Sequence, residues 1–234
     1  MKTLLMTLLL GVCAFAQNGP PRIVELKYLD PETLRFMVSA FQVNMNSAPG
    51  SHMVVLTGSK ENVAAAEEAL KRIDVPRRNI ELTFQVLDAM TQPGEEKIPA
   101  DLDAVVKQLK NSFVYKGFRL VDTLQLRTQE GINGSITGAV PREKGGPSLR
   151  FLRVVFRSTS ITGDTKESTV HIDHLSFGSQ LPNGGDGKGG INYANTGIET
   201  SIDIPDGKKV VVGKANMDGE AGAYFLIVTA KVVD

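Results

Sequence analysis

Three kinds of local pattern follow one another without a gap between residues 52 and 90, and this stretch constrains the fold more than any other. The run His52–Thr57 is apolar and β-branched, and a glycine ends it. The segment 60–73 then places apolar residues at helical spacing, and Pro76 prevents the helix from continuing. From 79 to 87, apolar residues alternate with polar ones, as on a β-strand. The stretch therefore predicts a strand, an amphipathic helix and a second strand.

The residues before this stretch predict three further elements. Residues 22–28 alternate as in a strand, and residues 43–46 are a second, shorter strand. Between them, Asp30 is a good helix N-cap and Pro31 suits the first helical position, where a missing N–H does no harm. We therefore expect a first domain over residues 17–90, an α+β module of the order β-α-β-β-α-β with two helices on one face of a small sheet.

The second half of the sequence is rich in strands. Residues 91–97 have the composition of a linker, and a helix over 101–109 opens the domain that we expect at 98–234. Residues 200–213 predict a hairpin around a Pro-Asp-Gly turn. Further strands are predicted at 118–127, 135–140, 149–158, 168–177 and 223–233. The expected architecture is a β-rich, sandwich-like domain with one leading helix.

The first residues have the pattern of an export signal. Lys2 precedes a continuous apolar run from Leu4 to Val12, and an Ala-x-Ala site lies just before Gln17. Residues 1–16 are therefore predicted to be a signal peptide, and cleavage after it removes Cys13, the only cysteine. We expect a periplasmic protein that can associate with the outer membrane through its partners.

Composition excludes several classes of partner. The formal net charge is +0, so the chain lacks the basic footprint that nucleic acids require. No apolar stretch after the signal peptide is long enough to span a bilayer as a helix, so we expect no membrane span in the mature chain.

No motif in the sequence is complete enough to predict a catalytic, cofactor or metal site. The Gly-rich run 184–190 lacks the first glycine and the final Ser or Thr of a phosphate-binding loop, which favours a mobile loop instead. His171 and Asp173 would share one face of a strand, whereas His174 would point to the other, so the three should not converge on a metal. We expect no enzyme, no cofactor and no metal.

The motifs of the first domain resemble the ring-building N-domains of bacterial secretins, the outer-membrane channels of type II secretion and type IV pilus systems. The resemblance is carried by the strand Met53–Gly58, the helical segment from Val63 to Asp74 and the strand 80–88, and it extends back to Arg22. It implies a KH-like fold. Residues 200–213 also resemble a hairpin of the secretin core, although Lys214 replaces a family glycine.

The resemblance implies a function in protein–protein packing within a secretion or pilus-type envelope assembly. The partners would be other envelope proteins or copies of the same chain. The adjacent Arg77 and Arg78, in the expected turn after the second helix, are the candidate partner-binding residues. RNA binding, which some KH-like domains perform, lacks its Gly-x-x-Gly clamp because Glu61 stands at the last position. The alternative is a periplasmic protein whose β-rich domain binds a small ligand or acts as an enzyme.

The signal-peptide assignment gives the first testable prediction. Protein isolated from its native host should begin at Gln17, because the Ala-x-Ala site directs cleavage there. N-terminal sequencing measures this directly, and recovery of mature protein that still begins at Met1 would contradict export by this route.

Overall fold

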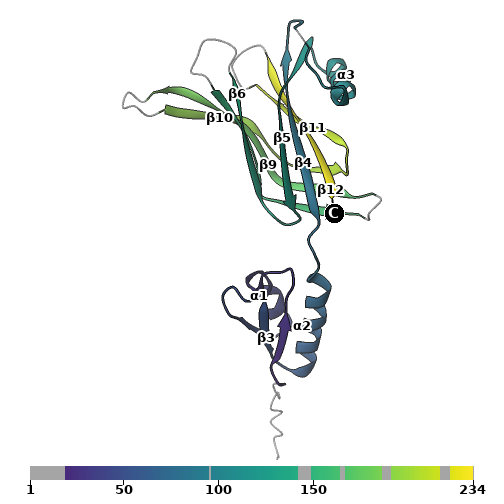
Figure 1. Cartoon of the computed structure of the whole chain (residues 1–234), viewed down its shortest axis with the longest axis vertical. Helices are drawn as coiled ribbons and strands as arrows, with labels where there is room; N and C mark the ends of the chain where they lie inside the picture. Colours follow the sequence, from purple (N-terminus) through teal and green to yellow (C-terminus); the bar gives the residue numbers. More distant parts are fainter. Residues whose placement is uncertain are drawn as a thin grey trace, which may run out of the picture. The chain divides into compact units, whose positions relative to one another are not determined.

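The computed structural model in Figure 1 describes residues 19–94, 96–141, 149–163, 167–185, 191–216 and 222–233. The chain divides after Pro76 into two compact units, called here the N-terminal unit and the C-terminal unit. The expected signal peptide, residues 1–16, and most of the Gly-rich run 184–190 lie outside the described residues. Among the described helices, none combines the length and the apolarity that crossing a bilayer requires.

The N-terminal unit is a three-stranded antiparallel sheet with two helices on one face. The sheet order is β1-β3-β2. The elements are β1 (Arg22–Glu25), α1 (Pro31–Ser39), β2 (Asn44–Ser47), β3 (Met53–Thr57) and α2 (Lys60–Ile73). The helix predicted over 60–73 is thus confirmed, with Val63, Ala66 and Leu70 buried as its spacing indicated. These residues share one core with Leu34 and Val38 of α1.

The carboxylate of Asp74 fastens the end of α2 to the loop before α1. It accepts hydrogen bonds from the backbone N–H groups of Lys27, Tyr28 and Leu29, at 2.7, 2.8 and 3.1 Å. Loops need such partners because their backbone groups are not paired in a ladder. At the other end of the same loop, Asp30 caps α1 by accepting from the N–H of Glu32, as the sequence predicted.

The C-terminal unit contains two antiparallel sheets. One has the strand order β11-β12-β4-β5, and the other has the order β10-β9-β7-β6, with β8 also paired to β9. The strands are β4 (Asn79–Met90), β5 (Gly117–Gln129), β6 (Gly134–Pro141), β7 (Leu149–Phe156), β8 (Ser158–Thr162), β9 (Thr169–Gly185), β10 (Ile191–Pro205), β11 (Lys209–Ala215) and β12 (Ala223–Val233). A short 3₁₀ turn, η1 (Ala100–Leu102), leads into the single helix of this unit, α3 (Asp103–Ser112).

Strand β4 belongs to the C-terminal unit, which corrects the expected domain boundary. We expected residues 79–90 to complete the first module and residues 91–97 to separate the domains. Instead, β4 pairs along its length with β12 on one side and β5 on the other, and the division falls after Pro76. The N-terminal unit is therefore β-α-β-β-α. The reason is burial: consecutive residues in the second half of β4 are buried, so this half needs a layer on each side.

Alternate side chains of β4 enter two different cores. Ile80, Leu82, Phe84 and Val86 face the core between the two sheets. Leu87 and Ala89 point the other way and pack against α3, together with Phe225 and Ile227 of β12. The C-terminal unit therefore has three layers, sheet on sheet with one helix outside, which agrees with the sandwich-like domain and leading helix that the sequence predicted.

The hairpin predicted at 200–213 is a connection between the sheets. Strand β10 ends at Pro205 and pairs with β9, whereas β11 begins at Lys209 and pairs with β12. Gly207 has a positive φ of 68°, and its N–H donates to the carbonyl of Ala230 at 2.8 Å. The turn was thus predicted correctly, but the prediction that its two flanking strands pair with each other was wrong. The same kind of turn can also lead a chain from one sheet to the other.

The two sheets also approach each other at their borders. Ile198 of β10 packs over Gly213 of β11. On the other side, the carboxylate of Asp122 in β5 occupies the space that a side chain at Gly138 of β6 would need. Glycine is required where another residue comes this close to the backbone.

The Asp74 interaction predicts a pH-dependent stability of the N-terminal unit. Partial burial acts to raise the pKa of the Asp74 carboxyl, but the three N–H donors and the charge of Lys27 outweigh it and lower the pKa below its ordinary value. A lowered folded-state pKa means stabilisation that is present above the ordinary pKa and is lost as the pH falls through the folded-state pKa. Asp74→Asn should therefore destabilise this unit by about 1–2 kcal/mol at neutral pH and by less in acid.

Amide hydrogen exchange in α2, measured against pH, reports this unit separately from the rest. Asp30→Asn is the matched control, because asparagine caps a helix about as well as aspartate. A loss in Asp74→Asn that is the same at every pH would contradict the assigned role of the charge.

Candidate functional site

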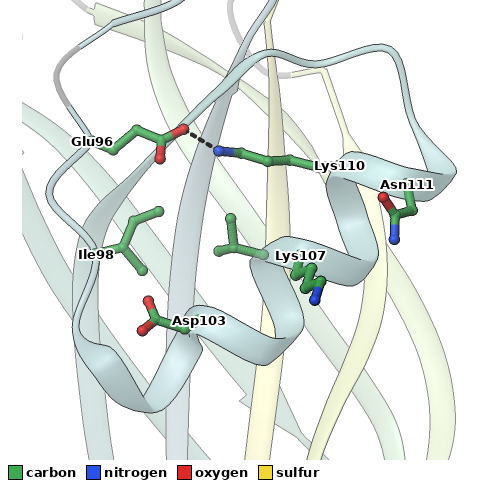
Figure 2. A pocket seen from close by; sticks show the side chains of 7 residues that line it. Glu96, Ile98, Asp103, Lys107, Lys110 and Asn111 are labelled. Atoms are coloured by element: carbon green, nitrogen blue, oxygen red, sulfur yellow. Dashed lines mark ion pairs between the residues drawn. The ribbon is translucent and has the colours of Figure 1, made fainter.

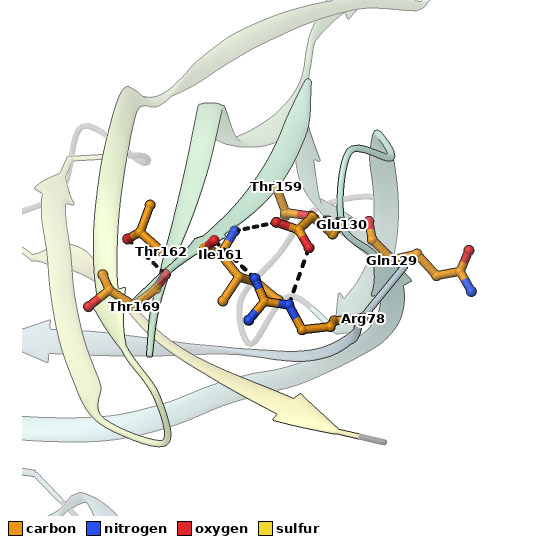
Figure 3. Close-up of polar contacts among 7 residues, drawn as sticks. All are labelled: Arg78, Gln129, Glu130, Thr159, Ile161, Thr162 and Thr169. Carbon is orange, nitrogen blue, oxygen red and sulfur yellow. Dashed lines mark hydrogen bonds and ion pairs between the residues drawn. The ribbon is translucent and has the colours of Figure 1, made fainter. Parts of the chain in front are cut away.

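Arg78, a candidate partner-binding residue, lies at the start of the C-terminal unit in a polar network that joins three segments (Figure 3). Its Nε lies 3.3 Å from Oε2 of Glu130, and its Nη2 donates to the carbonyl of Ile161 at 3.0 Å. The other carboxylate oxygen of Glu130 accepts from the N–H of Ile161 at 2.9 Å. Two side chains thus bind both backbone polar groups of one residue in β8.

The turn between β5 and β6 continues this contact along β8. The N–H of Gly131 donates to the carbonyl of Thr159 at 2.7 Å. The Thr159 hydroxyl donates to the carbonyl of Gln129 at 3.2 Å, and both residues are labelled in Figure 3. An open strand edge can pair with another chain, so edges of this kind are normally blocked. Here the edge of β8 that faces away from β9 is occupied by contacts from within the same chain.

The structure therefore distinguishes the two adjacent arginines, because the side chain of Arg78 takes part in this network. Both are half-buried. Because Arg78 holds β8 and Glu130, reversing its charge would disturb the fold as well as any partner contact. Partner binding by Arg77 and Arg78 stays a prediction, and Arg77 is the residue at which it can be tested cleanly.

His171 and His174, the two histidines of the candidate metal motif, have structural roles in strand β9. Nδ1 of His171 lies 2.7 Å from the Asp203 carboxylate on the neighbouring strand. His174 has a positive φ of 50°, and its N–H donates to the Ser201 hydroxyl at 3.0 Å. That hydroxyl in turn donates to Asp173 at 3.3 Å. In the part of the chain that the structure describes, no three potential ligands lie close enough together to hold a metal ion.

His174 marks a β-bulge, which the sequence pattern did not reveal. The register between β9 and β10 shifts at this point. The buried positions accordingly change phase, from Val170 and Ile172 before the bulge to Leu175 and Phe177 after it, and all four stay in the same core. An extra residue of this kind bends a strand. The strict alternation expected through 171–174 therefore does not hold.

A surface pocket of about 450 Å³ lies beside α3 (Figure 2). Glu96 and Lys110 form an ion pair across it at 2.6 Å, so their charges compensate each other. The remaining lining residues are Ile98, Asp103, Val106, Lys107 and Asn111. The pocket contains none of the histidines, and the charges of Glu96 and Lys110 already compensate each other. It offers no arrangement of a nucleophile and a base.

The N-terminal unit exposes apolar side chains on two opposite sides, which sequence reasoning overlooked. Ile23 is 71% exposed on β1, on the face of the sheet that the helices leave open, and the register sets it directly opposite Val55. Met53 lies further along β3 on the same face and is also exposed. Phe36 is 89% exposed on α1, about half a helical turn from the buried Leu34. Phe36 lies outside the apolar stripe of α1, and this position could have revealed its exposure from the sequence.

Comparisons with known proteins identify the fold. Three solved structures with similar folds are the type II secretin GspD of enteropathogenic Escherichia coli, the type IV competence pilus secretin PilQ of V. cholerae, and the secretin domain of InvG from the Salmonella SPI-1 injectisome. Their TM-scores are 0.56, 0.56 and 0.53, at 11%, 12% and 12% sequence identity. The matches cover 92%, 92% and 94% of this chain, and 88%, 77% and 89% of the other chains.

The chain therefore has a secretin-like fold. The likeness extends over nearly the whole chain and is not confined to the N-domain that the sequence motifs resembled. At these identities it defines the fold alone. The sequence matches no protein-family model, and a search of curated proteins found no significant similarity.

The Arg78 network gives a prediction that distinguishes the two arginines. Arg78→Ala removes the donors to Glu130 and to the Ile161 carbonyl, and should destabilise the C-terminal unit by about 1–2 kcal/mol, a value reduced by the partial exposure of the pair. Arg77→Ala is the control, with an expected change within about 0.5 kcal/mol. Amide hydrogen exchange in β8 measures the change in stability for each variant. Equal effects of the two substitutions would contradict the role assigned to Arg78.

Proposed function

We propose that the protein is an exported, non-enzymatic component of a secretion- or pilus-type envelope assembly, and that it works by packing against other proteins, including copies of itself. The observation that carries the proposal is the secretin-like fold over 92% of the chain. One of the similar structures is a pilotin–secretin complex from ETEC, so a protein of this fold has been seen bound to another protein.

The two apolar surfaces of the N-terminal unit support packing between copies. Val24 of β1 is packed into the core under the helices, so its neighbour Ile23 points to the opposite side of the sheet. Phe36 points outward from α1, on the helical side. An exposed phenylalanine on one side and an open apolar sheet face on the other cannot meet within one molecule. They can meet between neighbours.

A contact of this kind joins different surfaces of two identical chains. Such heterologous contacts repeat from copy to copy and close into a ring when the rotation allows it. Phe36 of one copy would then lie on Ile23, Met53 and Val55 of the next. Burying a phenylalanine side chain contributes about 1.5–3 kcal/mol, so the contact would act together with others rather than alone.

The proposal of a non-enzymatic role rests on the chemistry of the described residues. His171 is paired with Asp203, His174 forms a bulge, and the pocket beside α3 holds a compensated ion pair. The structure therefore gives no specific support to the alternative, a β-rich domain that binds a small ligand or acts as an enzyme.

Phe36→Asp should weaken self-association of the mature protein, because a carboxylate cannot be buried on an apolar sheet face without a large desolvation cost. Sedimentation velocity over a range of protein concentrations measures the effect as a fall in the average sedimentation coefficient. Thr33→Asp is the matched control, since it adds the same charge to an exposed position of the same helix.

Equal association of Phe36→Asp, Thr33→Asp and the unmodified protein would exclude α1 as a contact surface. Association that is lost in both variants would point to a general effect of charge.

A further inference from the structure

A second exposed apolar point lies in the C-terminal unit, at the loop between α3 and β5. The chain bends at Phe113 and Val114 directly after the helix ends. Val114 is 84% exposed and Phe113 is also exposed. We call residues 113–116 the α3–β5 tip. Phe113 and Val114 are adjacent, so their exposed surface forms one small apolar patch, and such a patch marks a contact site more than a single exposed residue does.

The residues on either side hold the tip in a fixed conformation. The rings of Phe113 and Tyr115 pack edge-on against the buried Phe225, with centroid distances of 5.1 and 5.9 Å. The N–H of Phe113 donates to the carbonyl of Leu109, and the N–H of Lys116 donates to the carbonyl of Met90, both at 2.9 Å. Val114 is therefore presented outward by a rigid support.

Three exposed lysines lie in or next to the tip in sequence or in space. Lys116 belongs to the tip, and Lys110 lies in the last turn of α3. Nζ of Lys214 lies 6.0 Å from the Phe113 ring centre and 5.6 Å from that of Tyr115, and donates to the Tyr115 hydroxyl at 3.2 Å. Lys110 is paired with Glu96, whereas Lys116 is part of the tip and Lys214 lies over its rings.

We propose that the α3–β5 tip binds the surface of a membrane that contains anionic lipids. In this arrangement Val114 and the edge of Phe113 enter the headgroup region, and Lys116 and Lys214 contact the negatively charged headgroups. Apolar and aromatic side chains flanked by lysines are typical of segments that lie at a membrane interface. Juxtamembrane lysines add electrostatic attraction to an anionic leaflet.

The small size of the apolar patch, with exposed lysines beside it, favours a lipid surface over an acidic protein. A protein partner would bury an apolar anchor in a pocket, and it would need polar contacts placed to match Lys116 and Lys214. A headgroup layer accepts exposed apolar side chains without a matching pocket and places negative charge wherever the lysines lie. A site with two apolar residues binds weakly, so it would act as one of many identical contacts in an assembly.

The absence of tryptophan from the chain allows a direct test. Val114→Trp introduces a single tryptophan at the tip, and Ile132→Trp is the matched control, an exposed apolar position in the turn at the other end of β5. The fluorescence of each full-length mature variant is measured with vesicles of phosphatidylcholine alone and with vesicles that also contain phosphatidylglycerol.

We expect the emission of Val114→Trp to shift to shorter wavelength with the anionic vesicles only, and the emission of Ile132→Trp to stay unchanged. Sedimentation with the same vesicles should show that Val114→Asp lowers binding by about tenfold, the value of burying one valine. Adding salt, or replacing Lys116 with Gln, should also lower it.

Three results would overturn the proposal: no shift with anionic vesicles, an equal shift with neutral vesicles, or an equal shift of the Ile132→Trp control. The first would also be the outcome if the tip served an acidic protein. Self-association through Phe36 is measured without lipid, so either proposal can fail without the other.

Discussion

Strands β4 and β12 run antiparallel through eleven consecutive residue pairs, from Asn79 opposite Val233 to Ala89 opposite Ala223. Both faces of this pair are covered along the half that contains Leu87 and Phe225. On one side lies the second sheet, and on the other lies α3. The pair contributes side chains both to the core between the two sheets and to the core under α3. Every layer of the C-terminal unit therefore depends on it.

The sequence predicted local structure well because local rules determine it. The spacing of Val63, Ala66 and Leu70 and the proline at 76 fix α2, and the bounds 60–73 agree with the structure. Alternation showed that residues 79–87 form a strand, but alternation says which face is buried and not which strand lies alongside. The consecutive apolar residues Val86 and Leu87 were the available sign of burial on both faces.

The remaining differences have the same origin in long-range contacts. The turn at Pro205–Gly207 was recognised from its residues, yet the partners of its two flanking strands lie elsewhere in the sequence. The bulge at His174 depends on the register with β10, which no local pattern encodes. The sequence alone suggests that Arg78 is a surface charge, because its partners in β8 and Glu130 are distant in the sequence.

These features together indicate where contacts with other molecules can form. In the C-terminal unit, the edge of β8 is occupied by Arg78, Glu130 and the turn beside it, and the borders of the two sheets approach each other at Gly138 and Gly213. In the N-terminal unit, by contrast, an apolar sheet face and an outward phenylalanine are left open. Among the sheet surfaces, this difference supports assembly through the N-terminal unit, whereas the C-terminal unit exposes apolar side chains at the α3–β5 tip.

Cysteine cross-linking in the native envelope tests this account most directly, because cleavage of the signal peptide would remove the only native cysteine. The account predicts that a chain carrying both Ile23→Cys and Phe36→Cys gives a ladder of dimers, trimers and larger species with a short bifunctional maleimide, whereas either substitution alone gives no ladder. A double variant that stays monomeric, or dimers formed equally well by Phe36→Cys alone, would contradict a contact between these two surfaces of neighbouring copies.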